Sequence, residues 1–224
     1  MTLITPITFY IPCLFGLEGL VGDELRRLHM HNIRVENGHV LCEGTAADIA
    51  RLNLNLRCGE RVLIVLGVFT ATSFDALFEN TRALPWENWV DRTGAFPVKG
   101  YSLDSALHSV PDCQKIIKKA IAARLGGKYG LEQLPETGAK HQVQFAIMHD
   151  RAALFLDTSG PGLHKRGYRA VGVKAPLRET LAAAMVTLSR YRGKDPFCDP
   201  FCGSGTIAIE AALIAKNRAP GLDR

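Results

Sequence analysis

Apolar positions in the first 70 residues follow the order strand, helix, strand, strand, helix, strand. The Asn37-Gly38 dipeptide between the two middle strands favours the positive φ angles of a type I′ hairpin turn. Thr45 suits the N-cap of the second helix. The β-α-β-β-α-β order is that of a ferredoxin-like unit. The strand patterns cover residues 8–13, 33–36, 39–42 and 61–69, and the helical patterns cover 17–28 and 45–56.

A second α+β region follows, with helical spacing over 74–80 and a strand pattern over 95–101. Ser109 and Pro111 open a helix that we expect to run to Leu125 and to stop at Gly126-Gly127. Residues 143–147 and 153–157 form a predicted hairpin. The Gly160-Pro161-Gly162 segment marks a domain boundary.

After this boundary the sequence pattern predicts a strand–turn–helix unit of the kind that binds nucleotides. A helix follows Pro176, and residues 196–206 predict a short buried strand, a glycine turn and an amphipathic helix that begins near Gly205. The glycines allow a ligand to approach the backbone, and the free N–H groups of the first helical turn point toward it. Asp199 at the end of the strand suits a ligand's hydroxyl or amino groups.

The glycine turn matches two kinds of motif. Residues 203–208 fit the dinucleotide pattern G-x-G-x-x-G/A, which is weak by itself, and no P-loop lysine follows. The longer string Asp-Pro-Phe-Cys-Gly-Ser-Gly-Thr over 199–206 resembles the cofactor motif of class I S-adenosylmethionine-dependent methyltransferases that act on amino groups of RNA and DNA. Phe201 stands where commoner methyltransferases have a glycine. The alternative is a plain strand–helix turn with incidental glycines. The resemblance implies these cofactor-binding residues: Asp199, Pro200, Phe201, Cys202, Gly203, Ser204, Gly205 and Thr206, with Thr180 in the first turn of the preceding helix.

Composition indicates a folded protein, with 47% hydrophobic and 22% charged residues among 224. No apolar run approaches the length of a membrane span, and the N-terminus lacks the basic region of a signal peptide. The six cysteines have no C-x-x-C spacing. For Cys198 and Cys202 we favour buried free thiols in a reducing compartment over metal ligation, and we expect a cytoplasmic protein without a bound metal.

The net charge of +5 is concentrated in two acid-free segments, residues 113–131 and 158–178, which each contain five Lys or Arg residues. Such segments suit nucleic acid. The first carries three lysines on one helical face, and the second mixes basic and aromatic side chains. The alternatives are a solvated face for the lysines and internal ion pairs for the second segment. The predicted RNA-binding residues are Lys115, Lys118, Lys119, His164, Lys165, Arg166, Tyr168 and Arg169.

Three stretches together resemble the THUMP-domain RNA methyltransferases, in particular the bacterial large-subunit ribosomal RNA guanine-N2 methyltransferase family. They are residues 157–169, residues 175–184 and the Asp199 motif, supported by Phe15-Gly16-Leu17-Glu18 near the start. The resemblance implies an α+β ferredoxin-like/THUMP N-terminal half, followed by the start of an α/β Rossmann-like class I methyltransferase domain. The implied domains are a ferredoxin-like segment over 1–70, a THUMP domain over 45–160 with a soft, overlapping boundary, and a linker with the first β-α part of a truncated methyltransferase domain over 161–224.

The same resemblance implies S-adenosyl-L-methionine as cofactor and 23S-type ribosomal RNA, before assembly, as partner, with no membrane and no obligatory protein partner. The family's catalytic Asn/Asp-Pro-Pro-Phe/Tyr motif is missing, since the chain contains no Pro-Pro pair. We therefore assign no catalytic residue and expect an N-terminal fragment that is inactive alone. The alternatives are a stand-alone RNA-binding module, an adenine-N6 methylase of DNA or RNA, and a dinucleotide oxidoreductase.

Overall fold

The computed structural model describes residues 6–169 and 176–224 and divides the chain into two compact units. The first unit combines residues 1–63 with 159–224, and the second comprises residues 64–158. The first unit therefore brings the two ends of the sequence together.

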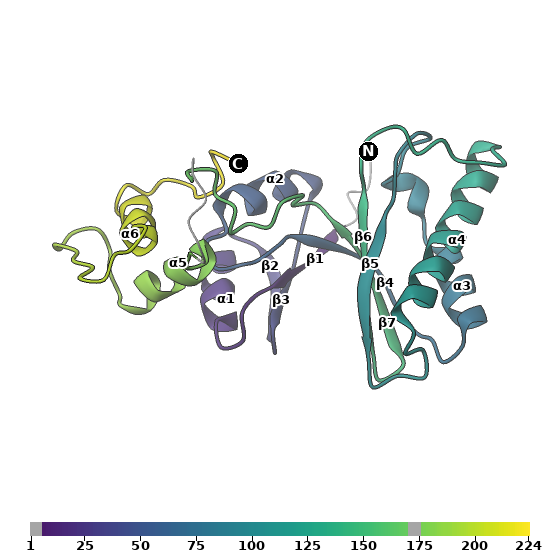
Figure 1. Ribbon diagram of the computed structural model, residues 1–224, viewed down its shortest axis with the longest axis horizontal. Helices are drawn as coiled ribbons and strands as arrows, with labels where there is room; N and C mark the ends of the chain where they lie inside the picture. The colour runs from purple at the N-terminus through teal and green to yellow at the C-terminus, as the bar shows by residue number, and fades with distance from the viewer. Residues whose placement is uncertain (1–5, 170–175) are drawn as a thin grey trace. The chain divides into compact units, whose positions relative to one another are not determined.

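The N-terminal part of the first unit has the predicted ferredoxin-like element order (Figure 1). Its strands are hydrogen-bonded in the order β2-β3-β1, and both pairs are antiparallel. Phe9 and Ile11 of β1 are fully buried, as are Val21 and Leu25 of the first helix, because alternate strand positions and one helical face point to the same core. The elements are β1 (Ile7–Pro12), α1 (Glu18–Arg27), β2 (His31–Glu36), β3 (His39–Gly44), α2 (Ala46–Asn55) and the start of β4 (Leu63–Thr70).

The turn between β2 and β3 differs from the type I′ prediction. Glu36 pairs with His39, so the loop has two residues, but only Gly38 has a positive φ, of 76°. The N–H of Gly38 donates to Glu18 Oε1 of α1 at 2.8 Å. This contact with a distant helix selects the turn, and the local preference of Asn-Gly does not. The type I′ prediction is wrong here.

The second unit is a sheet of order β4-β7-β6-β5 with both of its α-helices, α3 and α4, on one face (Figure 1). β5 runs parallel to β6, and β6 antiparallel to β7. The two-residue loop from β6 to β7 has positive φ at His149 (49°) and Asp150 (61°), the combination that a type I′ turn requires. The elements are α3 (Phe74–Ala83), the 3₁₀ helix η1 (Trp86–Asn88), β5 (Val98–Leu103), α4 (Val110–Tyr129), β6 (Gln142–Met148) and β7 (Arg151–Asp157).

Helix α4 continues through the two glycines at which it was predicted to end. Its C-cap is Gly130, with φ 66°, and the N–H groups of Gly130 and Leu131 both donate to Gly126 O. A Cβ on Gly126 would lie 2.8 Å from Leu131 O. Gly126 therefore makes room for the returning chain, which is a packing role and not a helix stop.

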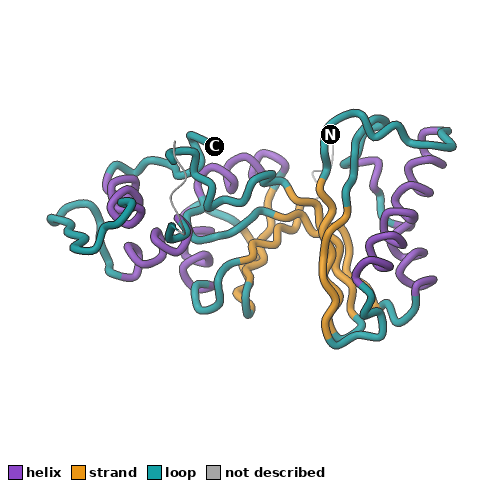
Figure 2. Tube along the Cα trace, in the orientation of Figure 1, coloured by secondary structure: helices purple, strands orange, loops and turns teal. Residues whose placement is uncertain are grey.

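Two further helices complete the first unit: α5 (Glu179–Leu188) and α6 (Thr206–Ala215) (Figure 2). The buried strand predicted before the glycine turn is not present among residues 176–224, and Phe201 is 93% exposed. A strand of a parallel sheet is stabilised by hydrogen bonds to neighbouring strands, and no strand pairs with this segment in the part of the chain that the structure describes.

Cysteine burial agrees with the prediction only in part. Cys42, Cys58 and Cys113 are buried free thiols, but Cys198 and Cys202 are exposed. The expectation that the latter two are buried is therefore wrong, because the segment that carries them is not part of a sheet. No helix in the described ranges 6–169 and 176–224 is long and apolar enough to cross a membrane.

Candidate cofactor loop and basic surfaces

The glycine turn forms a tight loop at the start of α6. Gly203 and Gly205 have φ angles of 52° and 75°, in the left-handed region that favours glycine. The N–H of Gly205 donates to Cys202 O at 2.7 Å and closes the turn. Gly205 is the N-cap of α6 and supplies no side-chain cap, so the N–H groups of the first helical turn face outward as a site for an acceptor.

Asp199 lies at the entrance of this loop. Its Oδ1 accepts a hydrogen bond from Phe201 N at 3.1 Å, which orients the carboxylate. Its Oδ2 is shielded from solvent and accepts no hydrogen bond from the described residues. A shielded carboxylate oxygen without a donor is costly, so this position is suited to a ligand that brings an O–H or N–H group.

Arg169 connects the loop to the start of α5. Its Nε donates to Glu179 Oε1 at 2.6 Å, and its two Nη atoms donate to Ser204 Oγ at 3.2 Å and to Thr206 Oγ1. Sequence reasoning placed Arg169 on RNA. The structure places it against the glycine turn, and its guanidinium also donates to Leu177 O at 3.5 Å, because a planar guanidinium can serve several acceptors at once.

Arg166 is 2% exposed and lies inside the first unit. It pairs with Glu210 of α6 at 3.4 Å and donates to the carbonyls of Leu56, Arg57 and Leu163. Its predicted contact with RNA disagrees with this burial, and all three nitrogens of its guanidinium already donate hydrogen bonds within the first unit. The ion-pair alternative is the one that the structure favours for this residue.

Tyr168 and Glu210 belong to the same buried group. Tyr168 Oη donates to Glu210 Oε1 at 3.2 Å, and burial raises the pKa of the phenol. Burial also raises the pKa of the Glu210 carboxyl, although Arg166 opposes the shift. The Tyr168–Glu210 hydrogen bond joins α6 to the segment that follows Gly162. The Tyr168 hydroxyl is therefore already engaged within the first unit, which limits its predicted contact with RNA.

Thr180 is fully buried, and its hydroxyl donates to Glu60 Oε1 at 2.6 Å. Its hydroxyl therefore already donates a hydrogen bond within the first unit, and its predicted contact with the cofactor stays a prediction. His164 Nδ1 lies 3.7 Å from Glu60 Oε2, and burial lowers the pKa of this histidine. Lys165 remains exposed.

The three lysines of α4 differ in their surroundings. Lys115 lies 3.5 Å from Asp112 and is largely exposed. Lys118 pairs with Glu136 at 2.9 Å and lies over the Phe96 ring. Lys119 lies 5.9 Å from the centroid of Phe78. The acid-free segment thus meets a carboxylate from a distant loop, which the sequence window does not reveal.

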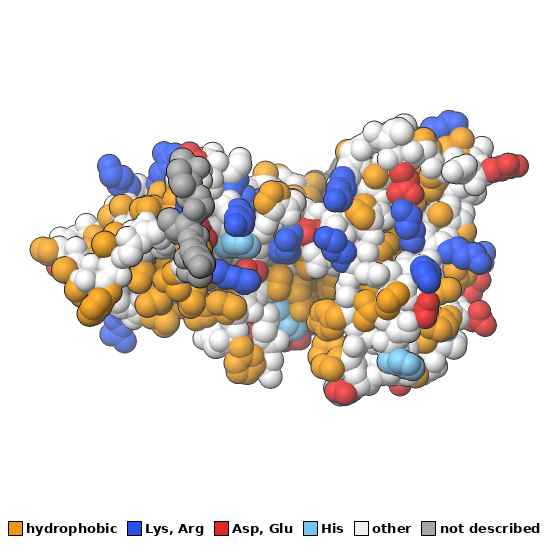
Figure 3. All heavy atoms as spheres, in the orientation of Figure 1, with side chains coloured by type: hydrophobic (Ala, Val, Ile, Leu, Met, Phe, Trp, Pro, Cys, Tyr) orange, Lys and Arg blue, Asp and Glu red, His pale blue; other side chains and the backbone are white. Residues whose placement is uncertain are grey.

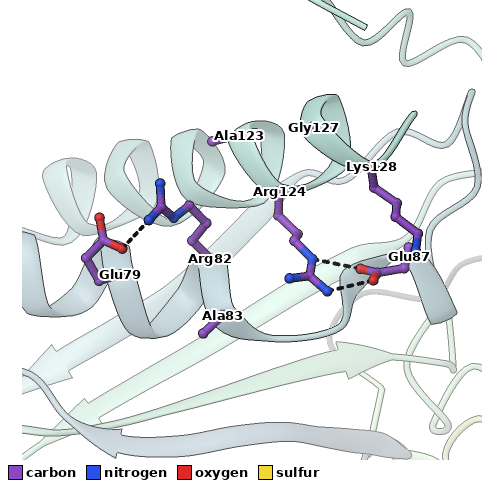
Figure 4. Close-up of a pocket in the computed structure, with 8 residues that line it drawn as sticks. All are labelled: Glu79, Arg82, Ala83, Glu87, Ala123, Arg124, Gly127 and Lys128. Atoms are coloured by element: carbon purple, nitrogen blue, oxygen red, sulfur yellow. Dashed lines mark hydrogen bonds and ion pairs between the residues drawn. The ribbon is translucent and has the colours of Figure 1, made fainter. Parts of the chain in front are cut away.

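A pocket of about 610 Å³ lies between α3 and α4, and sequence reasoning missed it (Figure 4). Arg124 donates to both oxygens of Glu87, at 3.0 and 2.6 Å, and Arg82 pairs with Glu79 at 2.6 Å. The Arg124 guanidinium lowers the pKa of Glu87 to about 2. Ion pairs neutralise most of the positive charge in the pocket. Arg124 and Glu87 are 37 residues apart, so no local sequence motif predicts their contact.

Three family models match successive parts of the chain. The RlmL ferredoxin-like domain matches residues 8–63, the THUMP domain matches 71–157, and the RMKL-like methyltransferase domain matches 166–224. The chain therefore combines a RlmL ferredoxin-like domain, a THUMP domain and part of an RMKL-like methyltransferase domain. This confirms the predicted fold class.

Two curated relatives align with nearly the whole chain. The chain is 49% identical over 211 residues to the putative RNA methyltransferase YpsC of Bacillus subtilis, covering 93% of this chain and 54% of that protein. It is 35% identical over 227 residues to the ribosomal RNA large subunit methyltransferase K/L of Syntrophotalea carbinolica, covering 98% of this chain and 31% of that protein. The chain thus spans about half or less of the length of these relatives.

Solved structures have the same fold over nearly the whole chain. A predicted N6-adenine-specific DNA methylase from Listeria monocytogenes is 51% identical with a TM-score of 0.95, covering 98% of this chain and 58% of that one. SMU.472, a putative methyltransferase solved as a complex with SAH, is 42% identical with a TM-score of 0.93 and the same coverage.

Proposed function

We propose that this chain forms the RNA-docking part and the first part of the catalytic domain of an S-adenosylmethionine-dependent RNA methyltransferase. The substrate would be a guanine N2 of large-subunit, 23S-type ribosomal RNA. The observation that carries the proposal is the loop of Gly203 and Gly205 at the start of α6, with the shielded Asp199 Oδ2 beside it. The relative complexed with SAH, the demethylated product of this cofactor, supports the choice of methyl donor.

The loop fits such a cofactor. A Cβ on Gly203 or Gly205 would meet its nearest neighbour only at 3.9 Å, so the space above the loop is open. In the proposal Asp199 accepts hydrogen bonds from the ligand, and the backbone of residues 200–206 lies against it. S-adenosylmethionine supplies an electrophilic methyl group on its sulfonium. Arg169 acts as a positioning residue, since it holds Ser204 and Thr206 without lying at the open side of the loop.

For RNA, the proposal uses the residues whose side chains remain accessible. Lys115 and Lys119 of α4 are exposed, and Lys165 is exposed in the first unit. Arg166 is excluded by burial, and Lys118 contributes less because Glu136 already pairs with it. The proposal assigns no residue of this sequence to orienting the target amine, since the sequence contains no Pro-Pro pair. We therefore expect no methyl transfer by these 224 residues alone.

A second candidate is methylation of adenine N6, the reaction for which the Listeria monocytogenes relative is named. A third is RNA binding without catalysis by these residues. A THUMP domain favours RNA over DNA as the docked polymer, and the K/L relative favours ribosomal RNA.

The deciding experiment maps modified nucleotides in large-subunit ribosomal RNA by mass spectrometry in a strain that lacks the complete gene. We expect one N2-methylguanosine to disappear. Complementation with Asp199→Asn should restore little of the modification, and the matched control Asp195→Asn, an exposed aspartate four residues earlier, should restore it fully. An unchanged guanosine map, or loss of an N6-methyladenosine instead, contradicts the proposed reaction.

A further inference from the structure

A groove of about 400 Å³ in the first unit has no assigned role. It lies between α1, Arg57 in the loop after α2, and the C-terminal ends of α5 and α6. Its volume is in the range of pockets that hold small ligands or single groups of a larger one. Four arginines line it: Arg27, Arg57, Arg190 and Arg192.

Two acids, Asp23 and Glu24, line the groove and offset only part of the charge of the four arginines. Asp23 pairs with Arg26 at 2.6 Å. Glu24 is buried and accepts hydrogen bonds from the backbone N–H groups of Arg57 and Cys58. No carboxylate within the described ranges forms an ion pair with Arg27, Arg190 or Arg192. The groove therefore carries a net positive charge.

Arg57 provides a second, independent observation. Its Nη2 donates to Arg218 O at 2.7 Å, which fixes the guanidinium at the groove. Its Nη1 is shielded from solvent and has no acceptor among the described residues. Shielded donors in native proteins are almost always paired, so this N–H indicates an acceptor that comes from outside the chain.

The segment that carries the exposed arginines has a defined conformation. Arg190 has a positive φ of 61°, and its N–H donates to Thr187 O. The Tyr191 ring packs against Phe197 with centroids 5.0 Å apart. Arg190 and Arg192 are thus presented from an anchored turn, where the planar guanidinium can bind phosphate oxygens in pairs.

We propose that this groove binds phosphate groups of the RNA backbone. The inference rests on the proposed function, because it takes the substrate to be RNA. The groove lies at the C-terminal end of α6 and the cofactor loop at its N-terminal end, so a bound phosphate would be held about 15 Å from the loop, the length of ten helical residues. RNA fastened there is kept close to the site of methyl transfer.

A structural role competes with this one. Arg27, Arg190 and Arg192 all lie at or just after helix C-termini, where cations stabilise the helix dipole. That role predicts that replacing the arginines lowers the stability of the fold and leaves the affinity for RNA unchanged. It does not explain the unpaired Nη1 of Arg57, which lies in a loop.

The test measures binding of the 224-residue chain to an unmodified large-subunit ribosomal RNA transcript over a series of salt concentrations. The variant is Arg190→Gln/Arg192→Gln. The matched control is Arg34→Gln/Lys140→Gln, which removes the same charge at exposed positions outside the groove. Each lost phosphate contact lowers the slope of log K against log salt by about 0.7 for single strands. We expect the groove variant to lose about 1.4 in slope and roughly 25-fold in affinity at ~0.1 M salt.

The charge-preserving variant Arg190→Lys/Arg192→Lys should retain most of the slope, and thermal unfolding of all variants reports on folding. Equal slopes for the groove variant and the control overturn the inference while the unmodified chain still binds RNA. Absence of RNA binding by the unmodified chain overturns the proposed docking role as well. A loss of slope in the groove variant alone supports the groove.

Discussion

The two units are stabilised in different ways. The second unit has an apolar core that includes Trp86, Phe96 and Phe145, and its described ion pairs lie toward the surface. The first unit also has an apolar core, but it buries charged groups, with Arg166 2% exposed and Glu210 fully buried. The second unit is therefore stabilised mainly by hydrophobic burial, whereas the first unit also depends on an internal polar network.

The polar network has a specific location. Arg166 donates hydrogen bonds to the backbone carbonyls of Leu56 and Arg57. Glu60 accepts a hydrogen bond from the Thr180 hydroxyl. These contacts join the ferredoxin-like segment to the methyltransferase segment, across 100 or more residues of sequence. Buried ion pairs add little net stability, but removal of one partner is costly. The network therefore makes the first unit sensitive to single substitutions where the two segments meet.

The largest effect is expected from Arg166→Met. The variant leaves the buried Glu210 carboxylate and three backbone carbonyls without their donor, so we expect a loss of about 3–5 kcal/mol in the free energy of unfolding, measured in urea. Burial raises the folded-state pKa of Glu210, so the part of the penalty that comes from its charge is absent at acidic pH, where the carboxyl is protonated in both states, and the cost of the unpaired carbonyls remains. The part that comes from the charge grows as the pH rises through the folded-state pKa.

Two controls sharpen this result. Arg166→Met/Glu210→Leu removes the charge as well and should recover part of the loss. Arg178→Ala removes an exposed cation that lies 3.5 Å from Glu60 and should cost no more than about 1 kcal/mol. If Arg166→Met is as stable as Arg178→Ala at neutral pH, the polar network does not stabilise the first unit.

A smaller effect, confined to the second unit, is expected from Trp86→Phe. The indole Nε1 donates to Thr81 O at 2.7 Å, and this carbonyl also accepts the N–H of Leu84 at 3.3 Å. The variant keeps the apolar packing and loses one hydrogen bond at the end of α3, at about 0.5–1.5 kcal/mol. Hydrogen exchange should accelerate in α3 and remain unchanged in β1 and β3. The control is Trp89→Phe, since no indole hydrogen bond is described for Trp89. Faster exchange in both units contradicts the separation.

The smallest effect is expected from Glu87→Gln at the pocket between α3 and α4. The depressed pKa of Glu87, about 2, means that its ion pair with Arg124 stabilises the protein above the ordinary pKa of a glutamate. That stabilisation is lost as the pH falls toward 2. Thermal unfolding should therefore differ between variant and unmodified protein at pH 7 and converge near pH 2. Glu79→Gln, at an exposed pair, is the control. A constant difference at all pH values would exclude the ion pair as its cause.

Local sequence patterns predicted the structure correctly where interactions between neighbouring residues determine it, as at helix N-caps. Thr45 forms the predicted N-cap, with Asp48 completing a capping box, and Gly205 is the N-cap of the helix after the cofactor motif. The patterns failed where a distant partner decides. Glu18 of α1 accepts a hydrogen bond from Gly38 in the turn, and Glu136 pairs with Lys118.

The apolar surface of the α5–α6 region, visible as hydrophobic side chains in Figure 3, follows the same rule. Met185, Leu188 and Phe201 are 45%, 60% and 93% exposed. Their apolar character made a buried strand and helix the natural prediction. Burial depends on which other segments pack there, and that information lies outside the local sequence.

By itself, the sequence determined most of the helices and strands of residues 7–157 and the glycine turn at the start of α6, because periodicity, capping and glycine placement act within a few residues. Only the tertiary structure decided what the cations do. It buried Arg166 beside Glu210, turned Arg169 toward the loop and gathered Arg27, Arg57, Arg190 and Arg192 around one groove. The physical reason is that the role of a charge depends on its partners and its solvation, and folding supplies both from distant parts of the chain.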